Sequence, residues 1–170
     1  MKPHEIFRHL STDEIDALVL SACADDEIPD KIAGGVLTYM NITLARFSKF
    51  PEPTRKAYVR RTLRDKKAVD LSLYVLSAGL MQGSPKVIEA FLEALGLVHE
   101  GPNLTTEGAV PEPKPEALAT AVDALLKAYP ARESALYLHA FTTQPDVDWP
   151  SLVELLATDK RLALEDRGQA

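Results

Sequence analysis

Residues 51–95 read PEPTRKAYVRRTLRDKKAVDLSLYVLSAGLMQGSPKVIEAFLEAL, and the stretch 111–159 follows a weakly similar pattern. Both begin Pro-Glu-Pro and continue through a helical pattern to a Leu-Tyr pair. In both, a later proline suited to opening a helix is followed four residues on by a glutamate. One helical hairpin cannot bury its apolar face alone, whereas stacked copies can. The pattern therefore predicts related helical units packed together, and a chance likeness between two amphipathic helix pairs is the alternative.

Part of the same pattern also occurs earlier in the chain. The tetrapeptide Val-Leu-Ser-Ala at 19–22 recurs at 75–78, and each copy is followed by a proline seven residues beyond its alanine. We therefore expect one all-α domain of about eight helices, built as an irregular, solenoid-like helical-repeat stack. An irregular orthogonal bundle is the alternative. The expected extents are 1–170 for the domain and 12–49, 51–96 and 111–159 for the repeat units.

Local signals predict where the helices begin and end. Ser11 and Glu14 have capping-box spacing, Ser84 is expected to cap the helix that Pro85 opens, and Asp148 to cap the last helix. The pair Gly34-Gly35 lies inside a predicted helix, where close helix packing is favoured over a helix break. The first expected helix begins after Ser11, and the second runs from Pro29 to about Lys49. The stretch from Thr54 to about Met81 is expected to be one bent helix or two helices joined near Lys67. Further helices are expected from Pro85 to about Leu95 and over 114–128, 131–142 and 148–158.

Residues 97–115 hold two glycines and four prolines, which exclude a continuous helix. We predict an ordered connector anchored by Leu97, Val98 and Leu104. A short strand pair at 97–99 and 103–105 fits the connector, although its alternation is weak.

Composition restricts the class of protein. The 170 residues are 46% hydrophobic and 26% charged, with a net charge of −6, as in an ordinary globular domain whose surface is not devoted to nucleic acid or anionic lipid. No apolar run is long enough to cross a membrane, and the first residues lack the apolar core of a signal peptide. Cys23 is the only cysteine, so no internal disulfide forms and a reducing cytoplasm is the expected location.

Residues 55–67 carry the strongest electrostatic feature. Seven basic residues and Asp65 give this window a charge of +6, which leaves −12 for the rest of the chain. On a helix, Lys56, Arg60, Arg64 and Lys67 share one face; with the neighbouring Arg61 they are called the basic stripe below. Either the stripe is a solvated face paired with the chain's own carboxylates, or it binds an anion. An acidic protein surface is favoured over nucleic acid, because no interleaved aromatic residues offer a base-stacking platform.

No catalytic or metal-binding motif is evident. His4 and His9 are five residues apart, unlike the histidines of a zinc-protease helix, and are expected on a solvated amino-terminal helix. Cys23 is expected to be a small buried hydrophobe, and His99 beside Glu100 has no nucleophile near it in sequence. We therefore expect no catalytic residues, no metal and no cofactor. Tyr74, Tyr137 and His139 are the candidates for a ligand pocket between helices.

The sequence favours a non-catalytic protein-interaction or adaptor module that uses the basic stripe to bind an acidic partner. The alternatives are a nucleic-acid-associated regulator acting through 55–67, and an enzyme or small-ligand binder with a site between helices. No membrane partner is expected. A homodimer is consistent with a short stack, because a terminal unit leaves an apolar face uncovered.

Overall fold

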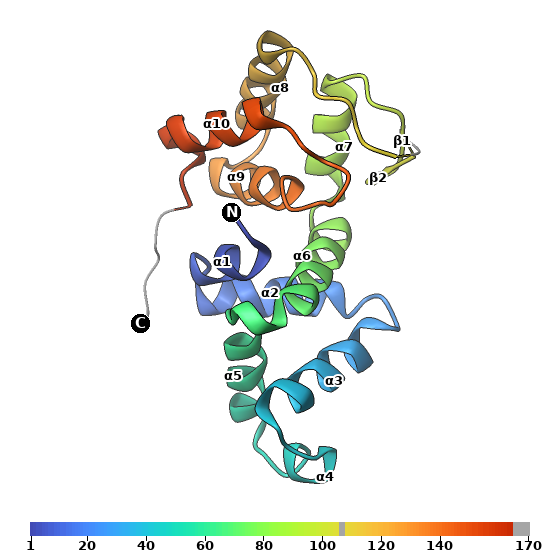
Figure 1. The fold of residues 1–170 in the computed structure, drawn as a ribbon, viewed down its shortest axis with the longest axis vertical. Coiled ribbons are helices and arrows are strands. Elements are labelled where there is room, and N and C mark those ends of the chain that lie inside the picture. The colour runs from blue at the N-terminus through green and yellow to red at the C-terminus, as the bar shows by residue number, and fades with distance from the viewer. Residues whose placement is uncertain (106–107, 165–170) are drawn as a thin grey trace. The chain divides into compact units, whose positions relative to one another are not determined.

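The computed structural model describes residues 1–105 and 108–164, and it confirms the all-α class (Figure 1). This part of the chain forms ten α-helices, two short 3-10 helices and a pair of two-residue strands. It divides into two compact units, 2–83 and 84–164. The boundary between the two compact units falls inside the expected repeat unit 51–96. The division into repeat units stays a prediction. Within the described ranges, no helix is both long and apolar enough to cross a membrane.

The N-terminal unit contains six α-helices and one 3-10 helix. The predicted stretch 54–81 is two helices joined at the 3-10 helix η1, which lies where Lys67 was expected to mark the join. The helices are α1 Pro3–Arg8, α2 Thr12–Ala22, α3 Ile28–Met40, α4 Leu44–Phe47, α5 Glu52–Leu63, η1 Lys66–Ala68 and α6 Val69–Gly83.

The core of this unit lies where α1 and α2 pack against α6. A glycine at position 79 permits close approach of α2, because a Cβ there would lie 2.7 Å from the backbone oxygen of Leu18. The prediction of a solvated first helix is wrong: His4, Ile6 and Phe7 of α1 are buried. Ile6 and Phe7 supply the apolar surface that holds α1 on the unit, and His4 lies on the same short helix.

The helix expected to run to Lys49 ends at Met40 instead. Asn41 adopts the left-handed conformation (φ 50°), and its N–H donates to the carbonyl of Thr38, which terminates α3. The helix does not break at Gly34-Gly35. A Cβ at Gly35 would lie 2.6 Å from Leu71 of α6, whereas one at Gly34 would meet nothing within 4 Å, so close packing explains only the second glycine.

The C-terminal unit places four α-helices around an aromatic cluster. The rings of Phe91, Tyr137, Phe141 and Trp149 have neighbouring centroids 5.0 to 5.8 Å apart. Gly96, with φ of 65°, follows α7 as predicted. The elements are α7 Pro85–Ala94, β1 His99–Glu100, β2 Asn103–Leu104, α8 Pro115–Ala128, α9 Ala131–Phe141, α10 Pro150–Thr158 and the 3-10 helix η2 Lys160–Leu162.

The connector is held mainly by a residue that the sequence analysis did not select. Val110 is buried, its carbonyl accepts a hydrogen bond from Trp149 Nε1 at 2.9 Å, and its N–H donates to the backbone carbonyl of Asp146 at 2.8 Å. Val98, expected as an anchor, is 70% exposed. The antiparallel pair of β1 and β2 forms within this connector.

Of two predicted helix caps, Ser84 lies at the expected N-cap position of α7 without a capping hydrogen bond, and the prediction for Asp148 is wrong. Ser84 makes no capping bond, and its hydroxyl instead donates to Glu133 of α9 at 2.5 Å. Asp148 is not the cap of α10, which begins after Trp149. The Ser151 N–H in its first turn donates to the carboxylate of Glu112, at 2.7 Å, so a distant acidic residue takes the place of a local cap.

Candidate binding groove

Two members of the basic stripe are paired with carboxylates of the same unit. Arg60 on α5 lies with Nη1 2.9 Å from both carboxylate oxygens of Asp16 on α2. Lys56 pairs with Glu52 one turn earlier on α5, also at 2.9 Å. The hydrogen bond and the charge of Glu52 raise the pKa of Lys56, and the same contact lowers the pKa of Glu52. These two cations are therefore largely neutralised by their own chain.

Arg64 has a structural role at the end of α5. Its Nε and Nη2 donate to the backbone carbonyls of Phe7 and Leu10, at 3.1 and 2.9 Å. In turn, Arg8 Nε donates a hydrogen bond to the Arg64 carbonyl at 3.0 Å. The last carbonyl groups of a helix have no partner within the helix and need donors from elsewhere. The Arg64 guanidinium supplies such donors at the end of α1, and these bonds hold α1 against the end of α5.

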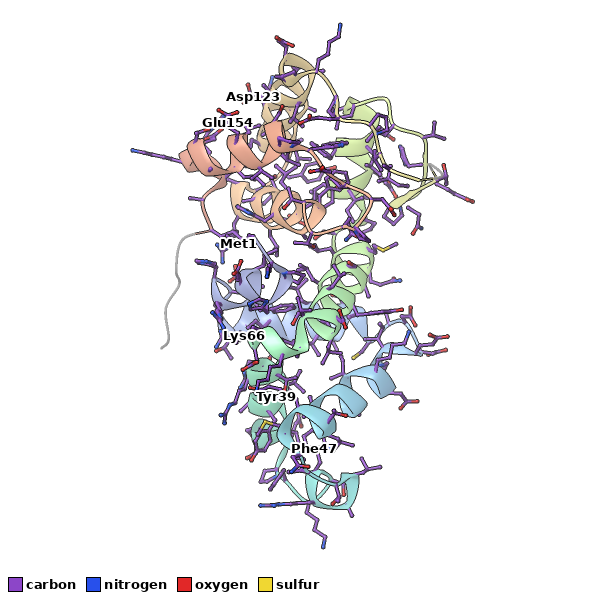
Figure 2. All side chains as sticks on the ribbon, viewed as in Figure 1. Met1, Tyr39, Phe47, Lys66, Asp123 and Glu154 are labelled. Atoms are coloured by element: carbon purple, nitrogen blue, oxygen red, sulfur yellow. The ribbon has the colours of Figure 1, made fainter. Side chains whose placement is uncertain are left out.

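The remaining stripe residues, Arg61 and Lys67, are exposed. Between them, Asp65 accepts a hydrogen bond from Tyr39 Oη at 2.5 Å and one from the Lys67 N–H at 2.9 Å. The hydrogen bond from Tyr39, followed by that from Lys67, holds the pKa of Asp65 below its usual value. Figure 2 shows Tyr39 in the part of the N-terminal unit formed by α3, α4 and α5. Three stripe side chains are thus bonded to their own chain. The expected single helix face is wrong, because α5 ends at Leu63 and Lys67 lies on η1, beyond the extended Asp65.

A groove of about 500 Å³ lies beside the stripe, between α2, α3 and α5. Figure 1 shows α2 and α3 diverging from the turn that connects them, with α5 across their open side. The lining is mostly apolar. It consists of Asp16, Ala17, Val19, Leu20, Cys23, Pro29, Ile32, Ala33, Val36, Phe47, Glu52, Arg55, Lys56 and Val59.

The groove has a buried floor and an exposed wall. Ile32, Val36 and Phe47 are buried, whereas Leu20 on α2 is 76% exposed. An exposed leucine beside an apolar hollow extends the apolar surface beyond the cavity itself. This arrangement suits an occupant that covers α2 as well as filling the space between helices.

The local sequence explains why the groove stays open. Helix α5 reads EPTRKAYVRRTL, so charged residues occupy most of the side that faces α2 and α3, and Val59 is its only aliphatic lining residue. At the α4 end, Phe47, Phe50 and Tyr58 pack together with centroids 5.3 to 6.5 Å apart. Of these three rings only that of Phe47, which Figure 2 labels, lines the groove.

Charges surround the groove unevenly. Its rim holds the two pairs Asp16–Arg60 and Glu52–Lys56. Arg55, which also lines it, and the exposed Arg46 and Lys49 near α4 make no ion pair with the residues described here. Between Cys23 and Pro29, the turn that joins α2 to α3 carries the exposed residues Asp25, Asp26 and Glu27, and the exposed Asp30 follows in the first turn of α3.

Sequence reasoning missed this groove. It placed Cys23 in the core, whereas the side chain is half-buried and lines the groove, where burial raises the pKa of its thiol. The available signal was the scarcity of apolar residues on α5, which leaves the apolar residues of α2 and α3 without a full covering helix.

The predicted ligand-pocket residues lie in different units. Tyr74 is on α6 in the N-terminal unit, 52% exposed, with Lys31 Nζ 4.4 Å from its ring centroid. Tyr137 and His139 are buried on α9 in the C-terminal unit, where His139 Nε2 is 3.1 Å from the Leu162 carbonyl. None of the three lines the groove. His99 Nδ1 contacts the Gly101 carbonyl at 2.8 Å, a bond local to the strand turn.

Within residues 1–105 and 108–164, no three histidine, cysteine or acidic side chains are placed to hold a metal ion. Comparisons of the chain with protein-family models, with curated proteins and with solved structures found no match.

Proposed function

We propose that this protein is a non-catalytic interaction module that binds an apolar helical segment of a partner protein in the groove between α2, α3 and α5. The observation that carries the proposal is the apolar groove of about 500 Å³ with the exposed Leu20 on its wall. Grooves between helices commonly take the apolar face of a partner helix, with anchors at positions i, i+3, i+4 and i+7.

The charges beside the groove favour a partner with an acidic flank. Arg46, Lys49 and Arg55 are exposed and without an ion pair in the described part of the chain, so they can attract carboxylates. Nucleic acid is less well supported, because Lys56, Arg60 and Arg64 already bond to groups of their own chain. A phosphate contact would have to replace those bonds.

The test is selection of helix-forming peptides from a library on the intact protein. Selected peptides should carry apolar anchors at helical spacing and lose at least tenfold in affinity when Leu20→Asp charges the wall or Ala33→Trp fills the groove. Val153→Asp is the matched control, since Val153 is an exposed apolar residue on α10 that lies outside the groove. Circular dichroism should show that all three variants fold.

Two results would contradict the interaction role. One is a library that yields no binder to the folded protein, or binders indifferent to both groove variants. The other is tight binding of an apolar small molecule, such as a fatty acid, in place of any peptide, since the groove volume also falls within the range of small-molecule sites.

A further inference from the structure

We infer that the groove selects a partner helix with opposite charges at its two ends, basic where it meets the α2–α3 turn and acidic where it meets α4 and α5. The inference rests on the proposed function and specifies its ligand. It comes from the distribution of charge along the groove rather than from the total charge of the chain.

The turn between α2 and α3 forms an acidic end. Cys23 and Pro29, which flank the turn, both line the groove. Between and just after them lie four exposed carboxylates, of which Glu27 pairs with Lys31 at 2.9 Å. The acidic side chains are Asp25, Asp26, Glu27 and Asp30.

The opposite side is cationic. Arg55 lines the groove on the first turn of α5, and Phe47 lines it from α4. Arg46 and Lys49 flank Phe47 in sequence and are exposed. A carboxylate brought to this side would meet Arg55, and Arg46 and Lys49 add exposed positive charge on the segment that carries Phe47. None of the three forms an ion pair among the residues the structure covers.

Two closed ion pairs on the α5 side of the rim add no net charge to it. Asp16 and Glu52 line the groove, and each is paired with an arginine or lysine of α5. An occupant therefore meets net negative charge at the α2–α3 turn and net positive charge where Arg55 lines the groove, with apolar surface and closed ion pairs elsewhere. Exposed charges act within a Debye length of about 8 to 10 Å at physiological salt, so each charged end of an occupant interacts mainly with the charges next to it.

The test uses helix-forming peptides of about 14 residues, roughly 21 Å long, that share one apolar stripe. The first peptide has lysines at one end and glutamates at the other. The second has the same composition with lysine and glutamate interleaved at both ends, and so controls for net charge. The third and fourth carry only glutamate or only lysine at both ends.

Fluorescence anisotropy at low salt should show the first peptide binding three- to tenfold more tightly than the other three. The preference should shrink at high salt, because screening removes the contribution of exposed charges. The double variant Lys49→Glu/Arg55→Glu should prefer the all-lysine peptide. Lys114→Glu/Lys127→Glu makes the same change in net charge on exposed residues of the C-terminal unit and should keep the wild-type order.

The inference is overturned if the four peptides bind equally at low salt, or if the Lys49→Glu/Arg55→Glu variant keeps the wild-type order. If they bind equally but Ala33→Trp abolishes binding, the groove is a docking site without end selectivity, and the proposed function survives. If no peptide binds the folded protein, the proposed function and this inference fail together.

Discussion

Arg60 on α5 and Asp16 on α2 form an ion pair in which one guanidinium nitrogen lies 2.9 Å from both carboxylate oxygens. The two side chains keep only 19% and 33% of their exposure, which makes this the least exposed of the ion pairs described. It joins two of the three helices that surround the groove.

A double-mutant cycle with Asp16→Asn and Arg60→Gln should therefore give a coupling free energy of about 1 kcal/mol in chemical denaturation, at the upper end for partly exposed pairs. The Glu52–Lys56 pair on α5 is the control. It is well exposed and within one helix, so its cycle should show a smaller coupling. Equal coupling in the two cycles would mean that the Arg60–Asp16 pair is no stronger than an exposed pair within one helix.

Alanine substitution at two glycines that both lie within helices should change the free energy of unfolding in opposite directions. At Gly79 a Cβ would lie 2.7 Å from the Leu18 carbonyl oxygen, so Gly79→Ala must push α2 away from α6 and should cost about 1 to 3 kcal/mol of unfolding free energy. At Gly34 nothing lies within 4 Å, so Gly34→Ala should stabilise by about 0.5 to 1 kcal/mol through lower backbone entropy in the unfolded chain. Urea denaturation measures both, and a stable Gly79→Ala protein would contradict the close packing of α2 on α6.

The hydroxyl of Tyr137 is buried and makes no hydrogen bond within the described residues, and burial raises its pKa well above the usual value. Removing an unsatisfied buried polar group is neutral or favourable, so Tyr137→Phe should leave the protein as stable or up to about 1 kcal/mol more stable. Tyr129→Phe is the comparison, because Tyr129 Oη donates to the Lys86 carbonyl at 3.1 Å and its loss should cost a few tenths of a kcal/mol. A clear destabilisation by Tyr137→Phe would show that the hydroxyl has a partner.

The carboxyl of Asp65 should titrate below the ordinary aspartate pKa of about 3.9, because Tyr39 Oη and the Lys67 N–H donate to it. Since the pKa is lower in the folded protein, the contact stabilises the fold fully above the ordinary value. The stabilisation is lost as pH falls through the folded value. In Tyr39→Phe the pKa of Asp65 should rise toward the ordinary value, as followed by NMR of its carboxyl carbon. An unchanged titration in Tyr39→Phe would exclude Tyr39 as the cause.

Much of the helix layout could be predicted from local sequence. The capping box at Ser11 and Glu14 forms, with the Ser11 N–H donating to Glu14 at 2.7 Å, and Gly96 ends α7 in a left-handed conformation. These signals act over one helical turn, so a single sequence contains all the information they need. The left-handed Asn41 has the same local nature, but asparagine adopts this conformation less regularly than glycine.

The features that were missed depend on residues distant in sequence. Glu112 takes the place of a cap on α10, and Arg64 bonds to carbonyls of Phe7 and Leu10, more than fifty residues earlier. The groove arises in the same way, because it needs α5 to lie across α2 and α3 while offering them few apolar side chains. Sequence spacing placed Lys56 and Arg60 one turn apart on α5, but it could not show that the helix ends at Leu63 or which basic residues the rest of the unit would engage.

The central claim is that the groove between α2, α3 and α5 is the binding surface. The most direct measurement is the change in backbone amide NMR shifts when the peptide with lysine and glutamate ends is titrated into the isotopically labelled protein. The account predicts that the largest changes fall on Leu20, Ala33 and Val59, which line the groove from its three helices. Changes confined to the C-terminal unit, or to Arg61 and Lys67 with the groove residues unaffected, would contradict it.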